Sequence, residues 1–117
     1  MSEIKNAKIT ETELGYEDHG IMTCWIEIEG FGWGVSYGGY ALDNYDKKKD
    51  ERIGTESGFN AIIQLMQTLE VKNWEDLRGQ YVRCELAGWG GKMLKIGHLL
   101  KDKWFSFEDY FKKELEG

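Results

Sequence analysis

Residues 31–38, FGWGVSYG, alternate large and minimal side chains, and this pattern constrains the fold more than any other stretch of the chain. Successive side chains of a β-strand point to opposite faces. A strand here therefore carries bulky groups on one face and almost none on the other. Glycine in a strand often marks a close approach by another backbone or by a ligand. The pattern leaves open which face a helix covers, and hence whether Trp33 and Tyr37 are core or surface.

Other segments have the same period of two. Residues 4–14 alternate weakly and predict a first strand, whereas residues 21–29 alternate clearly. In the second segment Cys24, Ile26 and Ile28 share one face, and Trp25, Glu27 and Glu29 share the other. Residues 80–98 predict a hairpin that turns at 88–91.

Two helices are predicted between and after these strands. Thr55 or Ser57 can cap the first, whose apolar face is predicted to hold Phe59, Ile62, Ile63, Met66 and Leu69. Ser106, with Asp109 three residues later, starts a C-terminal helix. Residues 43–52 are predicted to be a charged connection. The order β-β-β-α-β-β-α indicates an α+β fold, with an antiparallel sheet of about five strands, in one domain spanning residues 1–117.

Composition narrows the class of protein. The 117 residues are 41% hydrophobic and 31% charged, which excludes a disordered chain. The net charge is −6, and residues 1–42 alone sum to −5, so general nucleic-acid binding is disfavoured. No apolar stretch is long enough to span a membrane, and no signal-peptide pattern is present. We expect a cytoplasmic protein with free thiols and no membrane association.

Catalytic and metal motifs are weak. Gly34–Gly38 matches GxSxG, and Asp43 and His98 follow in hydrolase order, but Ser36 lacks the strand–turn–helix context. Cys24 and Cys84 form no CxxC pair, and two histidines have poor spacing for a metal site. We therefore expect no enzymatic activity, no catalytic residue, no metal and no cofactor.

The candidate binding site is an acidic strand face with aromatic side chains. Glu27 and Glu29 flank Trp25 on one side, and Glu11 and Glu13 can lie on a neighbouring strand. Rows of carboxylates can imitate a phosphate backbone and occupy a basic groove on another protein. Trp25 and Trp89 are the candidate anchors, since tryptophan is enriched in interface hot spots. The alternative interpretation is a solvated face that keeps the sheet from aggregating.

Two other functions remain open. In the first, the protein sequesters a nucleotide or small ligand, with Trp33, Tyr37 and Tyr40 stacking on a base and Arg83 or Lys92 on a phosphate. In the second, it assists DNA replication or recombination through a basic surface. The residues of that surface would be Lys92, Lys95, Lys101 and Lys103.

Several stretches together carry a resemblance. They are GYEDHGIMT (15–23), GGYALDNYD (38–46), GTESGFNAI (54–62), VKNWEDLRGQYVR (71–83) and IGHLLKDKWF (96–105). Through them the chain resembles a family of small bacteriophage and prophage proteins. The resemblance implies a bacterial host cytoplasm and a host protein as partner, as for phage inhibitors of host defence, including anti-CRISPR proteins. It implies no catalytic residue, and the sequence is also compatible with a homodimer.

Overall fold

The computed structural model describes residues 2–88 and 91–116 and has an α+β fold. Six antiparallel strands form the main sheet in the order β3-β2-β1-β6-β7-β8, so the sheet is one strand larger than predicted. In chain order its strands are β1 (Glu3–Tyr16), β2 (Met22–Gly30), β3 (Trp33–Gly38), β6 (Tyr81–Leu86), β7 (Met93–His98) and β8 (Trp104–Phe105). The α-helices are α1 (Glu56–Leu69) and α2 (Phe107–Glu116), and the 3₁₀ turns are η1 (Asp18–Gly20) and η2 (Trp74–Leu77).

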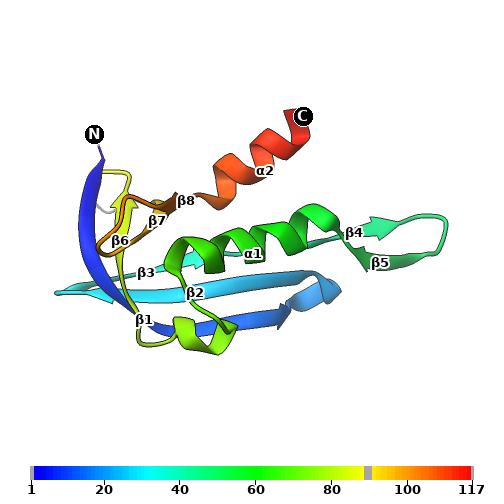
Figure 1. Ribbon diagram of the computed structural model, residues 1–117. Helices are drawn as coiled ribbons and strands as arrows, with labels where there is room; N and C mark the ends of the chain where they lie inside the picture. The colour runs from blue at the N-terminus through cyan, green and yellow to red at the C-terminus, as the bar shows by residue number, and fades with distance from the viewer. Residues whose placement is uncertain (1, 89–90, 117) are drawn as a thin grey trace.

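Strand β1 belongs to two halves of the sheet and contains a β-bulge. Its first residues pair with β6, and residues from Lys8 onward pair with β2. The register slips by one between Ile9 and Glu11, and the hydroxyl of Thr10 donates to the carbonyl of Glu27 at 3.3 Å. A bulge inserts one residue and bends the strand. Figure 1 shows β1 curving from the β6 side of the molecule into line with β2.

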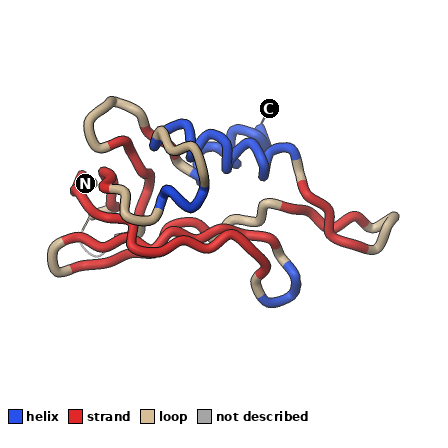
Figure 2. Tube along the Cα trace, turned by 60° about the horizontal axis from the view of Figure 1, so that its bottom comes forward, coloured by secondary structure: helices blue, strands red, loops and turns tan. Residues whose placement is uncertain are grey.

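The helices lie on the concave side of this bent sheet (Figures 1 and 2). Alternate residues of β2 and β6 point inward and are buried, as their period of two predicts. They meet Ala61, Leu65 and Leu69 of α1 and Phe107 of α2 in one hydrophobic cluster. The helices therefore cover only the inner face of β1, β2 and β3, and the outer face is left to solvent.

The aromatic face of residues 31–38 turns inward, which settles the question that the sequence left open. Tyr37 is only 4% exposed, and its hydroxyl accepts from the amide of Phe107 at 3.0 Å. Trp33 and Val35 are half-buried against the core, and Trp33 lies over Gly30 so closely that a Cβ there would overlap the indole. The glycine face of β3, with Gly34 and Ser36, points outward and is exposed.

Helix α1 forms where predicted, with Thr55 as its cap, but its buried face was predicted only in part. The hydroxyl of Thr55 accepts from the amide of Gly58 at 2.9 Å. Ile62 and Leu69 are buried as expected, whereas Phe59 is 68% exposed and Ile63 is also exposed. Apolar residues occupy too wide an arc of this helix for all of them to face one sheet.

The charged connection predicted at 43–52 is instead a two-stranded hairpin, β4 (Asp43–Asp46) and β5 (Glu51–Gly54). It projects from the rest of the molecule (Figure 2). A partly buried ion pair holds its base: the guanidinium of Arg52 donates to both carboxylate oxygens of Asp43, at 2.7 and 3.0 Å, and lowers the pKa of that carboxyl group. Charge pairing, which strand periodicity does not detect, forms this element.

Deleting Thr10 should strongly destabilise the protein. Without the extra residue, either Glu11 and Glu13 turn toward the core or the pairing with β6 slips, and burying an unpaired carboxylate costs several kcal/mol. We expect the free energy of unfolding in urea, followed by tryptophan fluorescence, to fall by more than about 3 kcal/mol. Thr10→Ala, which loses one exposed hydrogen bond, should cost less than about 1.5 kcal/mol. A deletion variant with a wild-type midpoint would contradict the role assigned to the bulge.

Candidate acidic interface

The outer face of β1 and β2 brings the predicted acidic residues together. Because the bulge reverses the parity of β1, Glu11 lies directly opposite Glu27, and Glu13 lies opposite Trp25. Glu29 follows on β2, between Lys8 of β1 on one side and the bare Gly34 of β3 on the other. Carboxylates two residues apart along a strand are separated by about 6.6 Å, and neighbouring strands by about 4.8 Å. The four glutamates, all exposed, thus form a grid of negative charge, here called the acidic face (Glu11, Glu13, Glu27 and Glu29).

Most of this charge is uncompensated. Within residues 2–88 and 91–114, the acidic face makes one ion pair, between Glu11 and Arg78 at 3.4 Å with both groups exposed. Glu27 accepts from the hydroxyl of Ser36 at 2.6 Å, which fixes its position without neutralising it. Like charges directly opposite one another destabilise a sheet. The Glu11–Glu27 pair is therefore maintained against a local cost in stability.

Trp25 lies at the border of the acidic face, where its half-buried indole ring is fixed by neighbouring residues. Its indole Nε1 donates to Oε1 of Glu17 at 2.7 Å, and the hydroxyl of Thr23 donates to the same oxygen at 3.1 Å. On one side the ring packs on Gly39, where a Cβ would come within 2.3 Å of it. Trp25 thus presents a fixed part of its surface rather than a mobile side chain. Trp89, the other predicted anchor, lies outside the described residues.

A hollow of about 350 Å³ opens beside Trp25, around the turn between β1 and β2. Two aromatic side chains and three carboxylates contribute to its walls. The lining residues are Glu13, Gly15, Tyr16, Glu17, Asp18, Thr23 and Trp25. The aromatic surface and the negative charge at this end of the acidic face are therefore combined in one concave site.

Two exposed aromatics were not among the sequence candidates. Phe31, at the tip of the β2–β3 hairpin, is fully exposed, and Tyr16, at the end of β1, is 78% exposed. Tyr16 thus directly precedes the turn that leads into β2, and Phe31 lies on the turn that follows β2. Phe31 shares the parity of Trp33 in the sequence, and only the turn geometry at Gly32, where φ is +76°, separates it from the buried face.

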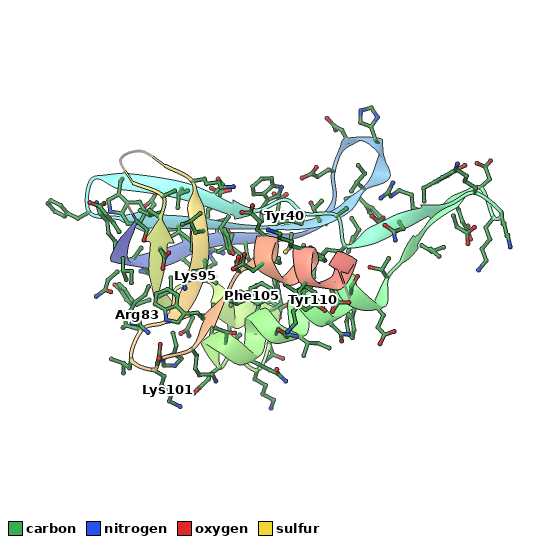
Figure 3. The ribbon with its side chains drawn as sticks, turned by 90° about the horizontal axis from the view of Figure 1, so that it is seen from above. Tyr40, Arg83, Lys95, Lys101, Phe105 and Tyr110 are labelled. Atoms are coloured by element: carbon green, nitrogen blue, oxygen red, sulfur yellow. The ribbon has the colours of Figure 1, made fainter. Side chains whose placement is uncertain are left out.

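The alternative ligand residues are not assembled into one site. Tyr37 is in the core, and Tyr40 stacks on Phe107 and Phe111 with ring centroids 5.6 and 5.8 Å apart. Figure 3 shows Tyr40 beside α2, and Arg83 away from it on β6. The guanidinium of Arg83 donates to the carbonyls of His98 and Lys101, at 2.8 and 2.7 Å. Trp33, on β3, packs near Lys5.

The four lysines proposed as a basic surface are each paired with a carboxylate. Lys92 lies 3.2 Å from Glu108, and Lys95 lies 3.5 Å from Glu85. Lys101 and Lys103 both contact Glu70 at the end of α1, at 2.7 and 3.0 Å. Figure 3 places Lys101 and Lys95 in different parts of the β7–β8 region. Three carboxylates thus pair with the four lysines, so most of their positive charge is locally compensated, in contrast to the charge of the acidic face.

The hydrolase-like residues are also apart. Ser36 contacts Glu27, Asp43 binds Arg52, and Nδ1 of His98 accepts from two backbone amides at 3.1 Å. Burial raises the pKa of both cysteine thiols to about 12, so neither is a reactive thiolate at neutral pH. In the part of the chain that the structure describes, no group of three or more His, Cys, Asp or Glu side chains is placed to hold a metal ion.

Comparisons of the chain with protein-family models, with curated proteins and with solved structures find no match. Among the helices of the described ranges, none combines the length and the hydropathy needed to cross a bilayer.

Replacing Glu70 should change the acid stability of the protein. Hydrogen bonds from Lys101 and Lys103 lower the pKa of Glu70 from 4.5 to about 2. A carboxylate with a depressed folded pKa stabilises the fold above its unfolded pKa, and this contribution is lost as the pH falls through the folded value. We expect Glu70→Gln to lower the urea midpoint at pH 6, and the difference from wild type to narrow between pH 4.5 and pH 2.

Glu75→Gln is the matched control, because Glu75 makes no ion pair with the described residues. Its midpoint should follow that of wild type at each pH. A Glu70→Gln midpoint that stayed equally far below wild type at pH 2 and pH 6 would show that the lysine contacts are not the source of the effect.

Proposed function

We propose that this protein is a non-enzymatic, phage-type inhibitor that binds a basic surface of a bacterial host protein through its acidic face. The observation that carries the proposal is the grid of exposed carboxylates, with Glu13, Glu27 and Glu29 making no ion pair in the described chain. Such a surface attracts cationic partners and speeds their association. The sequence resemblance supports the phage and host assignment.

The distribution of ion pairs over the surface favours this function over the alternatives. A solvated, merely protective face needs charge but not the direct opposition of Glu11 and Glu27. The lysines that a DNA-binding accessory would use are held by carboxylates, and the aromatics that a nucleotide site would use are buried or separated.

The test is capture of a host protein, followed by charge reversal. Tagged protein is incubated with lysate of phage-infected bacteria, and the eluate is analysed by mass spectrometry. We expect one stoichiometric host protein whose retention weakens as salt rises, because charge pairs at an interface rim are screened. Glu27→Lys with Glu29→Lys should lower the affinity at least about tenfold and abolish inhibition of that protein.

Glu51→Lys with Glu114→Lys is the matched control. It makes the same change in net charge on the projecting hairpin and on α2, away from the acidic face. The control should bind and inhibit like wild type. Equal binding by both double variants would remove the acidic face from the interface, and a catalytic turnover of any captured partner would overturn the non-enzymatic assignment.

A further inference from the structure

The hollow beside Trp25 differs from the rest of the acidic face because it is concave and has aromatic walls. At about 350 Å³ it is large enough for one side chain and lies at the lower end of the range of small-molecule pockets, about 300–1,000 Å³. Tyr16 and Trp25 supply aromatic surface, and Glu13, Glu17 and Asp18 supply carboxylates. Within the described ranges, no lysine, arginine or histidine lies within 4.0 Å of any of these three carboxylates.

Two of the wall side chains, Trp25 and Glu17, are held in place by contacts within the chain. One oxygen of Glu17 accepts from both Trp25 and Thr23, and Thr23 is only 3% exposed. The backbone of the turn closes through the amide of Glu17, which donates to the carbonyl of Ile21 at 2.8 Å. On its other side the indole is backed by Gly39. A site whose side chains are already ordered loses less conformational entropy on binding.

We propose that this hollow is a socket for the guanidinium group of an arginine on the bound partner. This inference rests on the proposed function and names the chemistry that the interface recognises. A guanidinium is planar, stacks on aromatic rings and donates to carboxylates in a fork geometry. In the hollow it would stack on Trp25 while Glu13, Glu17 and Asp18 accept its hydrogen bonds.

Arginine fits this site better than lysine does. The ammonium of lysine is strongly hydrated and has no planar surface to stack. Guanidinium is weakly hydrated and can stack on an aromatic ring while it donates hydrogen bonds to carboxylates. The acidic face can attract either cation at long range. The socket would add selectivity for arginine and would fix the register of the partner on the sheet.

The test uses the isolated full chain and needs no host protein. The indole N–H signals of the five tryptophans are recorded by ¹H–¹⁵N NMR, and the signal of Trp25 is identified by its loss in Trp25→Phe. The protein is then titrated with Nα-acetyl-arginine amide. We expect a saturable shift of the Trp25 signal, with much smaller shifts from the lysine analogue and from the citrulline analogue, which is the neutral counterpart of arginine.

Variants locate the binding. Asp18→Asn and, separately, Glu13→Gln should each weaken arginine binding at least about threefold, while Glu51→Gln on the projecting hairpin should leave it unchanged. A dispersed spectrum shows that each variant is folded. No saturable shift, an equal shift with the lysine analogue, or equal weakening by Glu51→Gln would overturn the socket.

The two proposals fail separately. If arginine amide binds beside Trp25 but no host protein is captured, the socket stands and the inhibitor function is overturned. If a host protein is captured through Glu27 and Glu29 but arginine amide does not shift the Trp25 signal, the function stands and the socket is overturned.

Discussion

The bulge in β1 is the constraint on which the rest of the structure depends. Ala7, Ile9, Glu11 and Glu13 share one parity, so an unbroken strand would direct all four to the same face. The extra residue at Thr10 reverses that parity, and Ala7 and Ile9 enter the core while Glu11 and Glu13 reach solvent. The same distortion bends the sheet around α1. One inserted residue thus creates both the concave core and the acidic face.

Charge is divided between the two halves of the molecule. At the β6–β8 end, lysines and the guanidinium of Arg83 are held by carboxylates, backbone carbonyls or the Trp104 ring, and they close the loop between β7 and β8 against α1. On the acidic face, Glu11 is the one glutamate that makes an ion pair within the described residues. The charges at the β6–β8 end are therefore engaged in contacts within the molecule, whereas the acidic face keeps its field available to another molecule.

Local signals in the sequence predicted much of the fold. The period of two gave β2, β3 and the β6–β7 hairpin, and Thr55 and Ser106 marked the helix starts. The β4–β5 hairpin was missed because its base is held by the Asp43–Arg52 pair and not by an apolar stripe. Phe59 was misplaced because hydrophobicity alone does not say which part of a wide apolar arc meets the sheet.

The sequence by itself determined which residues can share a strand face, since alternation follows from backbone geometry. On β2 one face had to hold Cys24, Ile26 and Ile28, and the other face had to hold Trp25, Glu27 and Glu29. Only the tertiary structure decided that Glu11 joins Glu27, that Tyr37 is core, and that Trp25 is fixed by Glu17 beside a hollow. Those outcomes depend on a one-residue slip in register and on which face the helices cover, and both are set by contacts between segments far apart in the chain.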